Sequence, residues 1–208
     1  MLIEKGHSLK VLVFKSAKGI PSKNTEIVKG DITKIEDVLN LIEGVDVVIH
    51  LAAKVDIGQD VSGNIFKVNK LGSENVVEAS IKHKVKRIIY FSSIHTFNPF
   101  PLDETLDETR ELIDSNGSDY DKSKIAGEVA LNKAMAEGIE TVVLCPTSVF
   151  GPNDYSPSLL GGAITDIYKR KIPALIPAGY DFVDVRDVAL GTLLALEKGK
   201  SGEKFILS

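Results

Sequence analysis

Short apolar runs alternate with helical segments along most of this sequence, and this alternation restricts the fold more than any other feature. Six runs have the length and composition of strands: residues 9–14, 25–29, 45–51, 87–92, 140–145 and 204–207. Most of them are apolar throughout, which is typical of strands that are buried on both faces. The pattern therefore predicts an α/β fold with a parallel sheet between two layers of helices. The β-branched run at 45–51 is expected to be a central strand.

The helical segments between these runs show recognisable ends. Helices are expected over residues 33–44, from 60–64 to about 83, and over 118–138, 163–171 and 185–198. Thr33 and Glu36 have the spacing of a capping box, and Ser118 is placed to cap the third helix. Met1 to Lys5 has the character of a last helical turn that Gly6 ends.

Composition indicates a soluble globular protein. Hydrophobic residues make up 43% of the 208 residues and charged residues 26%. The net charge of −4 argues against nucleic acid or an anionic membrane as the main partner. No apolar run approaches the roughly 20 residues that span a bilayer. The single cysteine, Cys145, fits a reducing compartment, so we expect a cytoplasmic protein.

Polar and small residues follow several of the predicted strands, at the sheet edge where nucleotides bind parallel α/β folds. Asp31 follows the second strand and could accept a hydrogen bond from an adenine amino group, with Ile32 against the ring; alternatively, Asp31 only caps a turn. Leu51, Ala52 and Ala53 follow the third strand. Small residues at such a position allow a flat cofactor to approach the backbone.

The next two strand ends carry further candidates. Ser92 and Ser93 could hydrogen-bond a substrate carbonyl oxygen, or they are ordinary turn serines. The segment Pro146-Thr147-Ser148-Val149 could line a nicotinamide pocket, or the proline only ends a strand. Asn69 lies in the middle of a helix, where it is either a buried amide that needs partners or an exposed residue.

Tyr120 and Lys124 are four residues apart in a predicted helix, so their side chains leave the same face. An ammonium beside a phenol favours phenolate and lowers the tyrosine pKa, which suits a proton donor and acceptor in carbonyl chemistry. Such a pair is common by chance. Its significance depends on the strand-end residues around it.

Other kinds of chemistry find little support. The four histidines and Cys145 lack zinc-ligand spacing, so no metal site is expected. The Gly-x-Ser-x-Gly elbow of Ser-His hydrolases is missing. His50, inside a strand, is expected to be a core histidine with satisfied hydrogen bonds, whereas His95 follows Ser93 and has a possible substrate role.

In this order, the motifs resemble the extended short-chain dehydrogenase/reductases, closest to the dihydroflavonol-reductase-like and NAD-dependent epimerase/dehydratase branch. The motifs are Gly30-Asp31, the run from Asp46 to Ala53, Asn69 to Val76, Phe91-Ser92-Ser93, Tyr120-x-x-x-Lys124, Pro146 to Pro152 and Phe182 to Ala189. The resemblance covers essentially the whole chain. It implies a Rossmann-like doubly wound parallel sheet and an enzyme that uses a nicotinamide cofactor.

The resemblance also implies a role for each matching residue. Tyr120 would be the general acid/base, and Lys124 would tune it and hold the nicotinamide ribose. Ser93 would orient the substrate oxygen, with Asn69 supporting the site. For the cofactor, Asp31 and Ile32 would flank adenine, Leu51, Ala52 and Ala53 would follow its backbone, and Pro146 to Val149 would line the nicotinamide. Ile94, His95 and Asn153 are assigned to the substrate side.

The family begins with a strand and a glycine-rich loop that holds the cofactor pyrophosphate, and neither is present in these 208 residues. We therefore expect a fragment of a longer protein, with a dinucleotide-binding domain over 1–151 and an incomplete substrate-side portion over 152–208. Phe14 and Lys15 stand where an acidic residue would select NAD. The lysine favours NADP.

Three functions remain open from the sequence. The first is a carbonyl reductase or alcohol dehydrogenase, and the second is a nucleotide-sugar epimerase or dehydratase that uses the same Ser93, Tyr120 and Lys124. The third is a non-catalytic dinucleotide-sensing regulator, which the Tyr-Lys pair disfavours. A small-molecule substrate is expected, and the family resemblance makes a homodimer possible.

Overall fold

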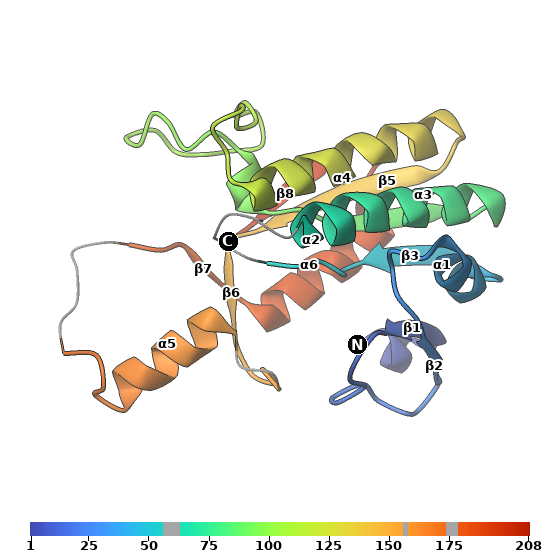
Figure 1. Ribbon diagram of the computed structural model, residues 1–208, viewed down its shortest axis with the longest axis horizontal. Helices are drawn as coiled ribbons and strands as arrows, with labels where there is room; N and C mark the ends of the chain where they lie inside the picture. The colour runs from blue at the N-terminus through green and yellow to red at the C-terminus, as the bar shows by residue number, and fades with distance from the viewer. Residues whose placement is uncertain (56–62, 156–157, 174–178) are drawn as a thin grey trace.

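A computed structural model describes residues 1–55, 63–155, 158–173 and 179–208 (Figure 1). Its strands are β1 (Leu9–Val13), β2 (Thr25–Lys29), β3 (Val47–His50), β4 (Arg87–Phe91), β5 (Glu140–Pro146), β6 (Ser148–Phe150), β7 (Phe182–Asp184) and β8 (Lys204–Leu207). Its α-helices are α1 (Ile35–Ile42), α2 (Asn64–Phe66), α3 (Gly72–Lys82), α4 (Asp119–Ala136), α5 (Leu159–Tyr168) and α6 (Val185–Lys198). Short 3-10 helices cover Ile3–Lys5 and Ile94–Thr96, and a π-helical turn covers Lys67–Leu71.

Within the described residues, all the strand ladders are parallel, as the sequence predicts, but they form three separate sheets. The main sheet has the order β3-β4-β5-β8, and β1-β2 and β6-β7 form two-stranded sheets. The expectation that residues 45–51 form a central strand is therefore wrong, because β3 lies at the edge of the main sheet. In the described residues, β1 and β3 are not paired with each other and no strand joins them.

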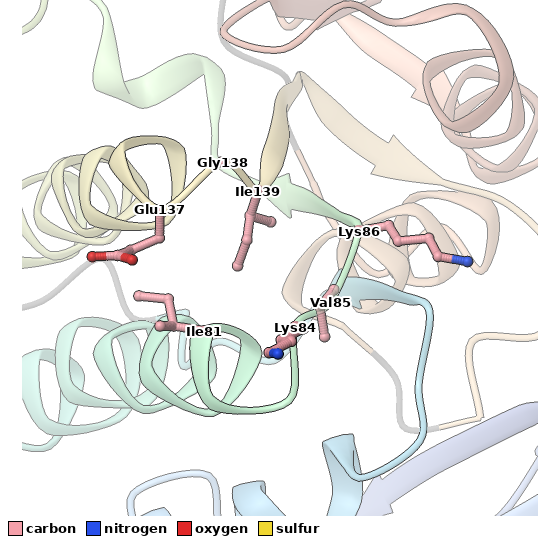
Figure 2. Close-up of a pocket in the computed structure, with 7 residues that line it drawn as sticks. All are labelled: Ile81, Lys84, Val85, Lys86, Glu137, Gly138 and Ile139. Atoms are coloured by element: carbon pink, nitrogen blue, oxygen red, sulfur yellow. The ribbon is translucent and has the colours of Figure 1, made fainter.

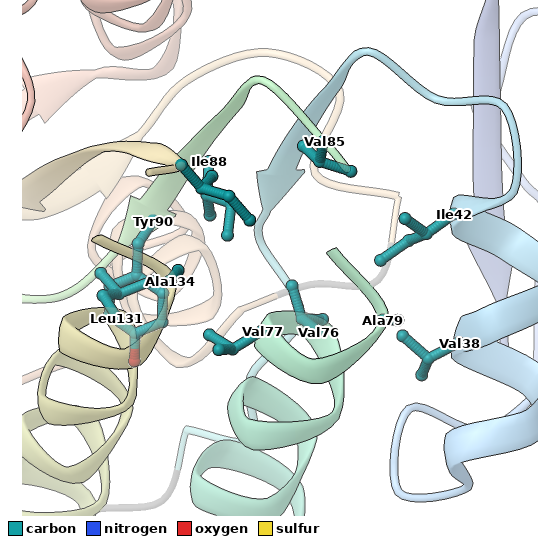
Figure 3. Packing of buried hydrophobic residues seen from close by; sticks show 11 residues of the cluster. Val38, Ile42, Val76, Val77, Ala79, Val85, Ile88, Tyr90, Leu131 and Ala134 are labelled. Carbon is teal, nitrogen blue, oxygen red and sulfur yellow. The ribbon is translucent and has the colours of Figure 1, made fainter. Parts of the chain in front are cut away.

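Helices cover both faces of the main sheet. Successive residues of β4 point to opposite faces, so each face has apolar side chains for the helices to cover. Ile88 and Tyr90 pack in one cluster with residues of α1, α3 and α4, whereas Ile89 packs on the other face with Ala195 of α6. Figure 1 shows α3 and α4 running side by side along the strands, and Figure 3 shows the first cluster, with residues of α1, α3, α4 and β4. The predicted doubly wound α/β fold is confirmed.

Helix α4 begins as the sequence predicts. The Ser118 hydroxyl accepts a hydrogen bond from the Asp121 amide at 3.2 Å, and the Asp121 carboxylate accepts one from the Ser118 amide at 2.9 Å. This reciprocal capping box satisfies two amides at the helix N-terminus and sets where α4 starts. The position of Tyr120 in the first turn of α4 follows from it.

Two other helix predictions are wrong in detail. Thr33 does not cap α1: its hydroxyl instead donates to the Asp31 carboxylate at 2.8 Å, and Lys34 precedes the helix without a side-chain cap. The short side chain of Asp31 competes successfully for these groups because it forms its own turn. Helix α5 covers Leu159–Tyr168 rather than 163–171, since the Ser158 hydroxyl accepts from the Gly161 amide at 2.9 Å and caps it.

Among the residues that the structure describes, no helix is long and apolar enough to cross a membrane.

Candidate active site

The carboxyl ends of the main strands meet at one edge, and most of the predicted site residues follow these ends. His50 of β3 pairs with Tyr90 of β4, and Phe91 pairs with Leu144 of β5. The Ser92 amide continues the ladder by donating to the Leu144 carbonyl at 2.7 Å. The residues after β3 and β4 therefore emerge side by side. Leu51, Ala52 and Ala53 are exposed there, with Leu51 at 63%.

Ser93 and Tyr120 are neighbours at this edge. Ser93 is buried, and its hydroxyl accepts a hydrogen bond from the His95 amide at 3.2 Å, which restrains the side chain. Burial raises the pKa of the Tyr120 phenol, a hydrogen bond with Ser93 lowers it, and the charge of Asp121 raises it further. The net direction is upward, so the expected lowering of the Tyr120 pKa is wrong.

Lys124 does not lower the tyrosine pKa because its ammonium is turned into the protein. It donates to the Phe91 carbonyl and lies 4.8 Å from the centroid of the Tyr90 ring. The side chain is buried, and burial lowers the pKa of Lys124 to about 8, while the negative charge of Glu128 acts in the opposite direction. Tyr120 and Lys124 thus share a face of α4 without sharing a contact that acts on the phenol.

Asn69 is buried and holds two parts of the site together. Its Oδ1 accepts from the Lys54 amide at 2.7 Å, and its Nδ2 donates to the Lys54 carbonyl at 3.0 Å. The same Nδ2 donates to the Ser123 hydroxyl of α4 at 2.9 Å. The interpretation of Asn69 as an exposed helical residue is excluded. Its place in the π-helical turn directs this amide toward the segment after Ala53 and toward α4.

His50 is a core histidine, as predicted. Its Nε2 lies 3.0 Å from the Ser73 hydroxyl, which itself donates to the Asn69 carbonyl at 2.6 Å. Because that donation uses the hydroxyl proton, Nε2 carries a proton and donates to Ser73. Burial, together with the charge of Lys124, lowers the pKa of His50 to about 3, so the imidazole is neutral.

The residues predicted to hold adenosine lie after β1 and β2. The Asp31 carboxylate accepts from the amide and hydroxyl of Thr33, and these bonds lower its pKa. Asp31 therefore does cap a turn. The carbonyl of Ile32 accepts from Asn75 of α3 at 2.9 Å. Phe14 is 69% exposed, with the ammonium of Lys15 5.7 Å from its ring centroid.

The segment after β5 contains an unusual polar atom. Thr147 is buried at 8% exposure, and its hydroxyl has no hydrogen-bond partner among the described residues. Pro146 ends β5, whereas Ser148 and Val149 belong to β6.

The three residues assigned to the substrate side are less closely grouped. Ile94 is half-buried beside Ser93, and His95 is exposed. Asn153 is exposed beyond β6, in a left-handed conformation with φ of 71°, and accepts from the Tyr155 hydroxyl. The structure thus brings Ser93, Tyr120, Lys124 and Asn69 together at the sheet edge and leaves Asn153 in a separate segment.

Glu128, Lys204 and Ser123 were not identified from the sequence, although their side chains form hydrogen bonds at this edge. Glu128 accepts hydrogen bonds from the Ser92 hydroxyl and, at 2.6 Å, from Lys204 of β8. Ser123 links Asn69 to α4. The four-residue spacing from Tyr120 to Lys124 continues to Glu128, and this was the signal that could have identified it.

A hollow of about 490 Å³ lies at the other end of the sheet and does not contact the candidate site. Figure 2 shows its lining, which comes from the ends of α3 and α4 and the starts of β4 and β5: Ile81, Lys84, Val85, Lys86, Glu137, Gly138 and Ile139. In the described ranges, no group of three or more His, Cys, Asp or Glu residues could hold a metal ion.

A parallel sheet with helices on both faces, and with serine, tyrosine and lysine side chains at its carboxyl edge, is the arrangement of the short-chain dehydrogenase/reductase class. Comparison with family models agrees: residues 1–207 match the model described as the NAD dependent epimerase/dehydratase family. The chain belongs to this family.

Individual relatives include a putative reductase and an enzyme solved with NAD+. It is 29% identical over 213 residues to a putative dihydroflavonol 4-reductase of Synechocystis, a match that covers 99% of this chain and 62% of the relative. A crystal structure of gox2253 is 31% identical with a TM-score of 0.89, covering 99% of this chain and 64% of that one. The Bordetella bronchiseptica enzyme WbmH in complex with NAD+ is 26% identical with a TM-score of 0.82, covering 100% and 69%. The chain thus spans about two thirds or less of these proteins.

Proposed function

We propose that this protein is an NAD(P)-dependent oxidoreductase that interconverts a carbonyl and an alcohol on a small molecule, with Tyr120 as general acid/base. The observation that carries the proposal is that Ser93 and Tyr120 meet at the carboxyl edge of the sheet, where the buried Ser93 side chain is close enough to lower the pKa of the Tyr120 phenol. A substrate oxygen that meets both hydroxyls there would be held in place and would exchange a proton with the phenol.

The electrostatics favour the reducing direction. Because burial raises the Tyr120 pKa, the phenol is protonated near neutral pH and is ready to donate to a substrate carbonyl. Lys124 supplies a buried positive charge one helical turn away, and Asn69 fixes the backbone of Lys54 after β3. A bound nicotinamide would supply the hydride.

The residues present fit such a cofactor along part of its length. The exposed small residues Ala52 and Ala53 leave the backbone accessible, and the unpartnered Thr147 hydroxyl is a buried donor and acceptor for an amide. Asp31 and Ile32 would lie at the adenine end. Lys15, with no carboxylate after β1, supports NADP over NAD. Titration of the purified protein with NADPH and NADH tests this preference, and tighter binding of NADH would contradict it.

An epimerase or dehydratase acting on a nucleotide sugar is the second candidate, because the family name includes both activities. A sugar-nucleotide pyrophosphate requires basic residues on the substrate side. Residues 152–173 offer Lys169, Arg170 and Lys171, but Lys171 is paired with Asp166 at 3.2 Å. This supports the reductase. The third candidate, a non-catalytic regulator, does not explain why Ser93 and Tyr120 are neighbours at the sheet edge.

One experiment separates these candidates. The purified protein is incubated with reduced cofactor and a panel of aldehydes and ketones, and separately with oxidised cofactor and nucleotide sugars. A reductase consumes reduced cofactor in proportion to the alcohol formed. An epimerase converts the sugar with no net change in the cofactor. Cofactor binding without either conversion would support the regulator and contradict the proposal.

We also propose that the dinucleotide-binding domain ends at residue 151 and that the substrate-side portion begins at residue 152. We further propose a homodimer that packs through α4. Val129 of α4 is 59% exposed, and Ala126 and Ala130 beside it are small. Sedimentation of the protein and of Val129→Glu measures the dimer: the charge should shift the wild-type dimer to monomer, and a wild-type monomer would contradict this part of the proposal.

A further inference from the structure

Beneath the candidate site, one carboxylate connects three elements of the fold. Glu128, on α4, is mostly buried, with 11% of its side chain exposed. One of its oxygens accepts from the Ser92 hydroxyl at the end of β4, and the other accepts from the Lys204 ammonium of β8 at 2.6 Å. Burying a carboxylate costs free energy because it loses its hydration. Hydrogen bonds to both oxygens offset part of that cost, so two partners are expected.

This carboxylate is adjacent to two residues of the candidate site. Ser92 precedes Ser93 in the chain, so a bond that restrains Ser92 also restrains the start of the Ser93 turn. Lys124 precedes Glu128 by one helical turn, and its ammonium donates to the carbonyl of Phe91, the residue before Ser92. Lys124 thus holds the backbone of Phe91 and Glu128 holds the side chain of Ser92, both from the same face of α4.

We propose that Glu128 is a positioning residue of the candidate site, whose carboxylate fixes the Ser92–Ser93 turn against α4 and keeps the buried Lys124 ammonium charged in its place. This inference rests on the proposed function, because it assigns Glu128 a part in supporting Ser93, Tyr120 and Lys124. Its test does not require turnover.

Several charges and titratable groups act around Lys124, and Glu128 is the carboxylate among them. They are Glu128 on α4, Tyr90 on β4, Cys145 on β5, His50 on β3 and, through its pair with Glu128, Lys204 on β8. His50 is neutral, and burial raises the pKa of Cys145 to about 12 and keeps Tyr90 protonated, so these three carry no charge near neutral pH. The charge balance at Lys124 therefore depends on Glu128 and Lys204.

This balance makes opposite predictions for two substitutions. Glu128→Gln keeps the shape of the side chain and removes the negative charge, so Lys124 should lose its proton at lower pH. Lys204→Met removes the neighbouring positive charge and leaves Glu128 unpaired, so Lys124 should lose its proton at higher pH. Both variants break the same ion pair. If Glu128 had a purely structural role, the pH at which Lys124 loses its proton would shift in the same direction in both.

The experiment follows Lys124 by NMR in protein that carries lysine labelled with ¹³C at Cε. The Lys124 signal is assigned by its loss in Lys124→Arg, and its chemical shift is measured against pH. We expect the midpoint to fall by about one pH unit in Glu128→Gln and to rise in Lys204→Met. Glu197→Gln, which breaks an exposed ion pair with Lys5, should leave it unchanged.

An unchanged midpoint in Glu128→Gln, or shifts of the same sign in both variants, would overturn the inference. If Glu128→Gln does not fold, Glu128→Asp decides instead: the shorter side chain withdraws the charge, so a lower midpoint supports the role and an unchanged midpoint contradicts it. A protein that shows these shifts but transfers no hydride would refute the proposed function and leave the inference standing. Turnover that depends on Tyr120 with no shift in Glu128→Gln would do the reverse.

Discussion

Asn69 Nδ2 lies 2.9 Å from the hydroxyl of Ser123, and this bond joins the π-helical turn before α3 to the residue that precedes Lys124 in α4. Asn69 also makes two bonds to the backbone of Lys54, after β3. Its side chain therefore holds together the strand end, the turn and the helix around the candidate site.

Asn69→Ala should destabilise the protein by about 2 kcal/mol or more, because it removes two bonds to the half-buried backbone of Lys54 and one bond to the buried Ser123 hydroxyl. The free energy of unfolding, measured with urea, checks this. Asn40→Ala, on the exposed side of α1, is the control and should change stability little. An Asn69→Ala variant as stable as the wild type would show that the three bonds contribute nothing.

Gly127 lets α4 approach the sheet and α3 closely. A Cβ at this position would lie 2.1 Å from the Tyr90 hydroxyl oxygen and 2.9 Å from the Ser73 hydroxyl oxygen. Gly127→Ala should therefore destabilise the protein by about 1–3 kcal/mol, despite the better helix propensity of alanine. Gly162→Ala in α5, where nothing lies within 4 Å of the added carbon, should be neutral or gain up to about 1 kcal/mol. Equal effects in thermal unfolding would contradict the close packing.

Buried His50 predicts a loss of stability in acid. Its pKa is about 3 in the folded protein and 6.5 in the unfolded chain, so the unfolded chain binds more protons between these values. Stability should therefore fall as the pH is lowered from about 6.5 toward 3, by up to roughly 4 kcal/mol from this group. His50→Gln keeps a donor for Ser73 but does not titrate, so its unfolding free energy should depend less on pH. An unchanged slope would show that His50 is not the group responsible.

The order of strands and helices was predictable from the sequence because it depends on local composition. Apolar runs such as 87–92 and 140–145 are too short for helices and too apolar for exposed strands, and Ser118 with Asp121 satisfies the first amides of α4 in any context. The cap of α1 was not predictable in the same way. Asp31 and Thr33 are both of residue types that cap helices. Only the folded turn determines that the Asp31 carboxylate accepts from the Thr33 hydroxyl, which leaves α1 without a side-chain cap.

The site was predictable as a set of residues but not as a set of contacts. Helical spacing places Tyr120 and Lys124 on one face of α4, yet it does not determine where a long flexible side chain ends. The Phe91 carbonyl and the Tyr90 ring attract the Lys124 ammonium, and both lie far from it in sequence. Glu128 and Lys204 were missed because their pairing joins α4 to a strand 76 residues later.

Single-turnover hydride transfer in Tyr120→Phe tests most directly whether Tyr120 transfers the proton. Tyr168→Phe is the matched control, since Tyr168 is 87% exposed on α5. With saturating cofactor and substrate, we expect Tyr120→Phe to lower the rate by at least about 100-fold while cofactor binding and the unfolding transition stay close to wild type. Tyr168→Phe should react at the wild-type rate. A Tyr120→Phe protein that folds and transfers hydride as fast as the wild type would contradict the account.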